Sequence, residues 1–237
     1  MKKNLLIIAA LLLMCLSAPP SFGIEIDVID ITKEKQYVDT LNRVGFRLLN
    51  ANGLTNRAIF RYDPKRVANA YALTHIRTDR RVVVYRGALM LCDSDDELAG
   101  VLGHEISHIM DSYDGILRGS FDILKYVLTP RKYEYKADKR SIDYMVKAGY
   151  NPVAYIVLMT KLMGQFRYDT IFSGHPLTTR RTAEVYEYIY KKYPYFLAEN
   201  AYKDNIYYQN FLLTSSENRR RLQKNIQSGS NKKTNYK

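Results

Sequence analysis

The spacing of apolar residues predicts a first helix followed by strands. Apolar positions recur at helical intervals from Val38 to Leu48, and Asn52-Gly53 then ends the run. Residues 58–62 and the stretch RRVVVYRGAL, residues 80–89, are rich in β-branched and aromatic side chains, which is typical of strands. The N-terminal part of the chain is therefore expected to combine one helix with a few strands.

The next segment begins with a capping box. Ser94 is followed three residues later by Glu97, so a helix should start here and run to about Met110. The residues from Asp111 to Gly119 are then expected to form a loop. Two later helices each begin where a capping residue precedes proline, at Thr129-Pro130 and Asn151-Pro152.

Helical segments fill most of the remaining chain. They are expected at about 130–149, 152–164, 178–192 and, in aromatic-rich sequence, 194–213. Residues 216–237 are polar and basic, and we expect them to be a disordered tail.

Composition and charge narrow the class of partner. The 237 residues are 46% hydrophobic and 25% charged, which suits one globular domain with its own core. The formal net charge of +12 would suit an acidic partner or an anionic membrane surface. No nucleic-acid-binding motif accompanies the scattered Lys and Arg residues, so no nucleic-acid partner is expected.

Residues 1–23 have the layout of a secretory signal peptide. A basic start precedes an apolar run from Leu5 to Leu16, which is short for a transmembrane span, and small residues with prolines follow. We expect secretion and a mature chain from Ile24; an uncleaved N-terminal membrane anchor is the alternative. Removal of the signal would leave Cys92 as the single remaining cysteine. A metal site would then have to be built from His and carboxylate ligands.

Two of the four histidines lie in VLGHEISHIMD, residues 101–111. On a helix, His104 and His108 share one face with Cβ atoms about 5–6 Å apart, so both imidazoles can bind one Zn²⁺. Glu105 would then lie beside the metal, where it can take a proton from zinc-bound water. The alternative is that the two histidines share a helix without a metal.

A catalytic zinc normally has a third protein ligand. Asp111 and Asp114 occupy the positions where the metzincin pattern requires Gly and His, which excludes that class, although Asp111 could itself be a ligand. Glu134 is the better candidate, with Asp138 one turn later as the acceptor of a ligand histidine's N–H. The alternative is that Glu134 and Asp138 pair with Lys or Arg on a solvated face.

A third histidine lies in SGHPLTTRR, residues 173–181. His175 ends a loop and Arg181 lies one to two turns into the next helix, so either could donate to the oxyanion of a tetrahedral intermediate. The alternative is that His175-Pro176 only starts a helix. His75, in a strand-like segment, is interpreted as structural.

Six segments in order resemble metallopeptidase family 48, the gluzincins that include the protease HtpX, the CAAX prenyl protease and Oma. They are NAYA (69–72), VVVYRGAL (82–89), DDELAGVLGHEISH (95–108), EYKAD (134–138), AGYNP (148–152) and HPLTTRR (175–181). The resemblance covers residues 37–193 and is strongest to the soluble periplasmic branch, such as the β-barrel assembly-enhancing protease.

This resemblance implies an α+β, zincin-like fold, mostly helical, with a small β-sheet that borders the active-site cleft. It implies one Zn²⁺ per chain held by His104, His108 and Glu134, with Glu105 as the general base. Asp138 would orient a histidine. His175 and Arg181 would lie near the metal, where they would stabilise the transition state or, for the histidine in some members, occlude the zinc.

The resemblance also implies where substrate binds. The Val-rich strand around Val83 would be the edge to which an extended substrate adds as a further strand, with Asn69 and Ala70 nearby. Residues 24–215 would form a zinc metalloendopeptidase domain that cleaves unfolded or misassembled envelope proteins in the periplasm. The alternative is a zinc-stabilised, chaperone-like binding protein with little proteolysis. In a third interpretation, the basic tail contacts an anionic membrane surface.

Overall fold

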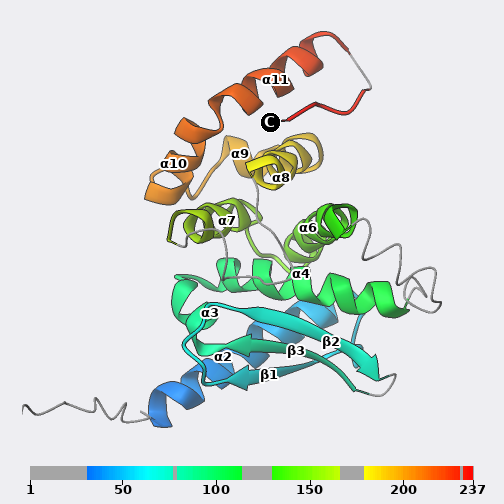
Figure 1. Cartoon of the computed structure of the whole chain (residues 1–237), viewed down its shortest axis with the longest axis vertical. Helices are drawn as coiled ribbons and strands as arrows, with labels where there is room; N and C mark the ends of the chain where they lie inside the picture. Colours follow the sequence, from blue (N-terminus) through cyan, green and yellow to red (C-terminus); the bar gives the residue numbers. More distant parts are fainter. Residues whose placement is uncertain (1–30, 77–78, 114–129, 166–178, 230–231, 237) are drawn as a thin grey trace, which may run out of the picture. The chain divides into compact units, whose positions relative to one another are not determined.

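A computed structural model describes residues 31–76, 79–113, 130–165, 179–229 and 232–236 (Figure 1). The chain divides into two compact units, Met1–Ile31 and Thr32–Lys237, and every described residue except Ile31 belongs to the second. The expected signal peptide lies outside the described residues, so that prediction stays open.

The described part is mostly helical with a small sheet, which confirms the α+β, zincin-like fold. The helices are α2 (Ile31–Ala51), α3 (Arg86–Leu91), α4 (Asp95–Tyr113), α6 (Pro130–Lys147), α7 (Val153–Gln165), α8 (Thr179–Lys192), α9 (Tyr195–Ala198), α10 (Ile206–Thr214) and α11 (Ser216–Gln227), and the strands are β1 (Ile59–Asp63), β2 (Ala70–Ile76) and β3 (Asp79–Tyr85). No helix within these ranges combines the length and apolarity that crossing a membrane requires.

The strand order in the sheet is β1-β3-β2, with β1 parallel and β2 antiparallel to β3. Val83 therefore pairs with Arg61 on one side and Tyr71 on the other. The prediction that the Val-rich strand is the cleft edge was wrong, because β3 is paired with a strand on each side. Its run of buried valines is typical of a strand whose two faces are both covered. In the described sheet, β2 is an outer strand.

The strand predicted for residues 80–89 also ends earlier, at Tyr85, where α3 begins. Gly87 lies against the backbone of the β1–β2 connection, and a Cβ at this position would be 2.3 Å from the carbonyl oxygen of Arg66. The Gly87 N–H donates to the carbonyl of Lys65 at 3.1 Å. The chain turns here because a glycine allows this close backbone approach.

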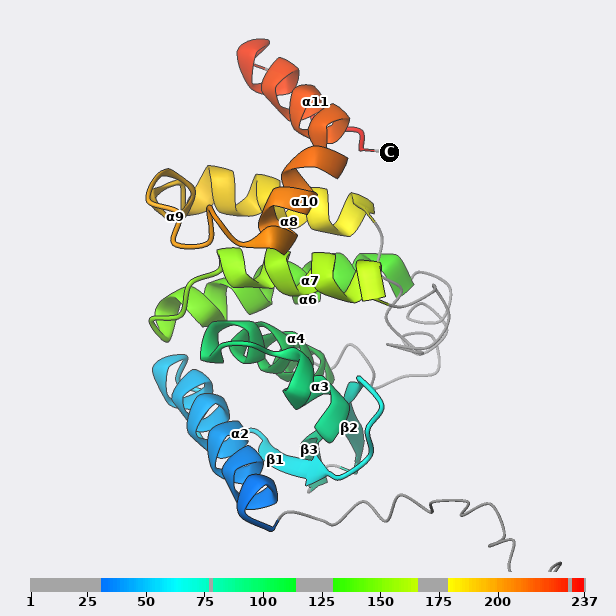
Figure 2. The same cartoon turned by 90° about the vertical axis from the view of Figure 1, so that its left-hand side faces the viewer.

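Helix α4 lies between the sheet on one side and helices α6 and α7 on the other (Figures 1 and 2). It contacts β2 and β3 on one side and α6 and α7 on the other, while α8 packs on α6 and α7. Two glycines of α4 make the helix contacts close: a Cβ at Gly100 would be 2.7 Å from the ring of Tyr155, and one at Gly103 would be 2.6 Å from the Ser141 hydroxyl. Residues of α4 are thereby brought against α6 and α7.

The capping signals place helix starts well and one helix end poorly. Ser94 Oγ accepts the N–H of Glu97 at 3.2 Å, as the capping box predicts, and Asn151 Oδ1 accepts the N–H of Val153 at the start of α7. Helix α4 continues to Tyr113, so the prediction that the loop begins at Asp111 was wrong. Asp111 accepts hydrogen bonds from Lys136 and Arg140 of α6, which hold the last turn of α4 in place.

The expectation that the tail from Ser216 is disordered was also wrong for its described residues. Residues 216–227 form α11, whose Leu222 is 3% exposed against α8. The segment 232–236 folds back, and the Tyr236 hydroxyl donates to Glu187 of α8 at 2.7 Å. Burial of Leu222, together with the contacts of Tyr236 and Lys233 with Glu187 and Glu184 of α8, ties this basic segment to the rest of the chain.

Candidate metal centre and active site

Three side chains from α4 and α6 converge in a buried cluster. His104 and His108 share one face of α4, and Glu134 lies in the second turn of α6. The two histidine Nε2 atoms are 3.1 Å apart, and each lies 3.4 Å from an oxygen of the Glu134 carboxylate. Within the described residues, this is a group that could hold a metal ion.

The shape of this triangle fits Zn²⁺. Nitrogen and oxygen ligands about 2.0–2.2 Å from a tetrahedral zinc lie about 3.3 Å from one another. The three donor atoms already have separations close to that value. Two imidazoles and a carboxylate are also the ligand types found at catalytic zinc sites.

The charge at the cluster favours a cation. Three carboxylates are buried here, those of Glu105, Glu134 and Asp138, and the described cation beside them is Arg181. With both histidines neutral, as metal ligands must be, this leaves two negative charges uncompensated in a desolvated site. Buried charges are costly unless paired, so a divalent cation is the natural counter-charge.

Asp138 and Tyr155 orient His104. The Nδ1 atom of His104 lies 3.1 Å from Asp138 Oδ1 and 3.1 Å from the Tyr155 hydroxyl, which itself donates to Asp138 at 2.8 Å. A proton held on Nδ1 by Asp138 leaves the Nε2 lone pair facing the cluster, as a metal ligand requires. Burial lowers the pKa of His104, but the hydrogen bonds to Asp138 and Glu134 outweigh it and raise that pKa to about 10. Positive charge at this position is therefore stabilised.

Arg181 of α8 holds both carboxylates of α6. Its guanidinium donates to the two oxygens of Asp138 at 2.8 and 2.6 Å, and Nη1 lies 2.9 Å from Glu134 Oε2. Burial alone would raise the pKa of Asp138, but the charge of Arg181 and its hydrogen bonds hold that pKa well below its usual range. Glu134 and Asp138 are each 1% exposed, so the alternative of a solvated face was wrong.

Glu105 is buried beside the cluster and makes no hydrogen bond through its carboxylate to any described residue. Its side chain is 0% exposed, and within the described residues neither carboxylate oxygen has a hydrogen-bond partner. Such a group in a native protein calls for an explanation, because an unsatisfied buried carboxylate is strongly destabilising. Water or a metal-bound ligand would supply the missing partner, which is the position expected of a general base.

The other predicted site residues are only partly placed. His175 lies outside the described residues. Asn69 precedes β2 and accepts the N–H of Tyr85 through its carbonyl at 3.0 Å, and Ala70 is fully buried at the start of β2. Contact of Asn69, Ala70 or Val83 with a substrate stays a prediction, as does donation by His175 or Arg181 to an oxyanion.

Tyr155 and the two glycines of α4 were not among the predicted site residues. Tyr155 stands in the apolar helix α7, where a tyrosine is typical of the core, and no local signal marks its hydroxyl as a partner of Asp138. The glycines could have been noticed as small residues on the helix that carries both histidines. They permit the close packing that brings the cluster together.

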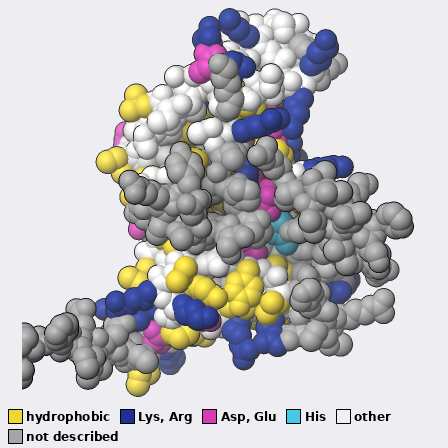
Figure 3. Space-filling model, in the orientation of Figure 1, with side chains coloured by type: hydrophobic (Ala, Val, Ile, Leu, Met, Phe, Trp, Pro, Cys, Tyr) yellow, Lys and Arg dark blue, Asp and Glu magenta, His cyan; other side chains and the backbone are white. Residues whose placement is uncertain are grey.

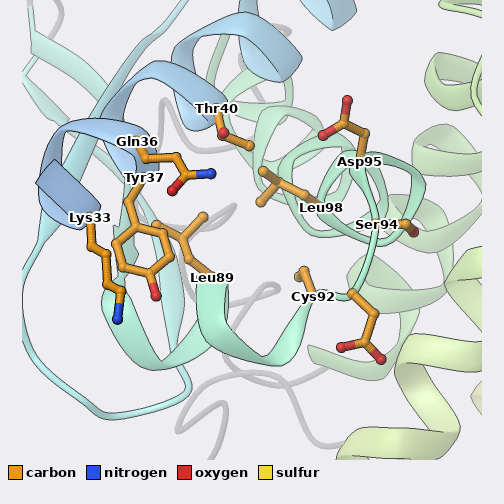
Figure 4. A pocket seen from close by; sticks show the side chains of 10 residues that line it. Lys33, Gln36, Tyr37, Thr40, Leu89, Cys92, Ser94, Asp95 and Leu98 are labelled. Carbon is orange, nitrogen blue, oxygen red and sulfur yellow. The ribbon is translucent and has the colours of Figure 1, made fainter.

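A pocket of about 370 Å³ lies between the first turns of α2 and the α3–α4 connection (Figure 4). Tyr37, Leu89 and Cys92 are among its lining residues. Burial, with the nearby charge of Glu97, raises the pKa of the free thiol of Cys92 well above its usual range, so the thiol is a poor nucleophile. This pocket contains no residue of the metal cluster.

The helix with two histidines, a carboxylate on the next helix as the third candidate ligand, and the small sheet beside them have the arrangement of a zincin. The model of peptidase family M48 matches residues 36–116 and 120–189, so this chain belongs to that peptidase family. A curated relative, a protease HtpX homolog of Methanothermobacter thermautotrophicus, is 54% identical over 44 residues. That match covers 19% of this chain and 17% of the relative. The family resemblance is confirmed, and the soluble periplasmic branch stays a prediction.

Proposed function

We propose that this protein is a zinc-dependent metalloendopeptidase. The observation that carries the proposal is the buried triangle of His104, His108 and Glu134 beside the unsatisfied carboxylate of Glu105. A structural zinc would not need a base beside it, and a peptidase does. Membership of peptidase family M48 supports the same reaction class.

The chemistry divides between the metal and the chain. When bound, zinc would polarise the scissile carbonyl and lower the pKa of its water to about 7. Glu105 would accept the proton of that water and later deliver it to the leaving amine nitrogen. Asp138 and Tyr155 would keep His104 in the correct tautomer and orientation, while Arg181 would hold the Glu134 carboxylate.

We propose that an extended substrate pairs with β2. This strand is an outer one, it contacts the histidine-bearing helix α4, and its N-terminal end carries Asn69 and Ala70. Figure 3 displays a histidine beside acidic side chains, with hydrophobic side chains over the sheet below it. Apolar, extended segments are exposed in unfolded or misassembled proteins, so these are the proposed substrates. With the signal-like N-terminus, the proposed compartment is the periplasm.

The test compares the wild-type protein with Glu105→Gln and Glu134→Gln. Purified wild type should contain about one zinc per chain and cleave an unfolded protein such as reduced casein. Glu105→Gln should keep the zinc and lose cleavage, because it removes the base and leaves the ligands. Glu134→Gln should lose zinc. Unchanged cleavage by Glu105→Gln would refute the mechanism, and suppressed aggregation without cleavage by the wild type would indicate the chaperone-like alternative.

A further inference from the structure

Helix α6 has a second face that the metal site does not use. Glu134 and Asp138 point into the cluster, whereas Lys132, Lys136 and Lys139 follow one another along the opposite side at helical spacing. This side borders a groove of about 630 Å³. The residues that line it are Lys132, Tyr135, Lys136, Lys139, Arg140, Asp143 and Lys233.

The groove is strongly basic even after its ion pairs are counted. Lys136 and Arg140 both contact the carboxylate of Asp111, at 2.6 and 2.9 Å. The one acidic residue of the lining, Asp143, is paired with Lys192 outside it at 2.8 Å. Within the described residues, no ion pair joins Lys132 or Lys139 to a carboxylate. Positive charge therefore remains inside a concave surface.

An aromatic ring lies among these cations. The ammonium of Lys233, which comes from the folded-back segment 232–236, is 5.1 Å from the centre of the Tyr135 ring, and the guanidinium of Arg180 is 5.8 Å from it. Lys233 also contacts Glu184 of α8 at 3.0 Å, so the second wall of the groove is fixed to the helix that carries Arg181. The groove thus has a formed wall on each side and an apolar surface for the stems of bound side chains.

We propose that this groove binds an acidic segment of a polypeptide substrate. The partner must be anionic, because positive charge lines the cavity, and electrostatic complementarity would both select it and speed its association. A concave groove of this volume suits a short extended chain, whereas a membrane surface would be met better by cations on a flat or convex face. The single aromatic ring is too little to stack successive bases of a nucleic acid.

The proposal rests on the proposed peptidase function and adds a substrate class to it. Lys132 and Lys136 stand two residues on either side of Glu134 in the same helix. An acidic segment held here would raise the effective concentration of a linked cleavage site near the metal. Substrates that carry acidic stretches would therefore be cleaved at lower concentrations.

The first test measures binding without catalysis. In the Glu105→Gln background, a fluorescein-labelled peptide of eight glutamates would be titrated at low salt, with an eight-glutamine peptide as the neutral comparison. Lys132→Glu with Lys139→Glu should weaken binding about tenfold or more, because two attractions become repulsions. The matched control, Lys203→Glu with Lys224→Glu, makes the same change of charge at exposed positions elsewhere. It should shift affinity less than about twofold.

Three outcomes would overturn the proposal. Equal loss in both double variants would mean that only the overall charge attracts the peptide. No loss in the groove variant would mean that the peptide binds elsewhere. Selective loss of binding to vesicles of phosphatidylglycerol and phosphatidylcholine, or to a single-stranded oligonucleotide, with peptide binding unchanged, would assign the groove to that other partner.

A second readout separates this proposal from the peptidase function. With active enzyme, the groove variant should raise the KM of a cleavable peptide that carries the acidic tag and leave its kcat and the cleavage of the glutamine-tagged peptide unchanged. If the wild type cleaves nothing, the peptidase proposal fails while the binding test still decides the groove. If cleavage proceeds with no preference for the acidic tag, the groove proposal fails alone.

Discussion

Replacing Arg181 by methionine should destabilise the protein far more than a typical loss of an ion pair. Arg181 is 3% exposed, and its guanidinium donates to the buried carboxylate of Asp138 and forms an ion pair with that of Glu134. Methionine fills much of the same volume but leaves both carboxylates without this partner. Breaking a buried charged pair on one side costs about 3–5 kcal/mol, because the remaining charge stays desolvated.

The assay is urea unfolding followed by circular dichroism at neutral pH, after removal of metal by a chelator. In thermal unfolding of the same samples, the expected loss of about 3–5 kcal/mol corresponds to a fall of about 6–20 °C in Tm for a chain of this size. The matched control is Arg220→Met. Arg220 also pairs with a carboxylate, that of Glu217, but both side chains are exposed, and the variant should show no measurable change.

A double variant distinguishes the loss of the charged pair from the effect of changing the shape of the side chain. Asp138→Asn combined with Arg181→Met should lose less stability than the two single losses added together, because the double change removes a charge from each side of the pair. An Arg181→Met protein within about 1 kcal/mol of the wild type would refute the reasoning. It would mean that water or other groups solvate Asp138 and Glu134 in place of the guanidinium.

Three further predictions follow from particular contacts. Tyr155→Phe removes the hydroxyl beside His104 and should weaken zinc binding about tenfold or more, measured by competition with a chelator; unchanged affinity would show that Asp138 alone orients the histidine. Gly103→Ala should destabilise the protein by about 1–3 kcal/mol, because the new Cβ would lie 2.6 Å from a hydroxyl, whereas Gly164→Ala, with nothing within 4 Å, should be neutral or stabilising; equal effects in urea unfolding would contradict the close packing. Burial would raise the pKa of Glu187, but its hydrogen bonds lower that pKa, so its contribution is present above the ordinary glutamate pKa and is lost as pH falls through the folded value. The stability difference between wild type and Glu187→Gln should be constant from about pH 5 to 7 and shrink below about pH 4; a constant difference at all pH values would contradict it.

Local signals predicted the helix starts and the first half of the site. The caps Ser94 and Asn151 act within a few residues of themselves, and the i, i+4 spacing of His104 and His108 fixes their common face wherever the helix lies. Glu134 could be proposed as the third ligand because it lies near the start of the next predicted helix. Its distance from the histidines depends on Gly103, through helix packing that the sequence does not reveal.

The errors arise where contacts distant in sequence decide the outcome. The Val-rich strand around Val83 looked like an edge only until its pairing on both sides was known. The last turn of α4 depends on cations from α6, and α11 depends on burying Leu222 against α8. Arg181 was identified as a site residue, but its contacts with Asp138 and Glu134 come from the packing of α8 on α6. Hydrophobic periodicity predicts one helix or strand at a time and does not identify the other elements that it will contact.

Because the candidate ligands come from two helices, metal uptake would be a late event in folding. His104 and His108 can meet on an isolated helix, but Glu134 joins them only after α6 has docked on α4 through Gly103. A chain in which α6 has not docked therefore offers at most two of the three ligands, so metal binding would stabilise the docked arrangement. The rate of zinc uptake during refolding would thus report the docking of these two helices. A chelator would compete most effectively with chains in which the two helices have not yet docked.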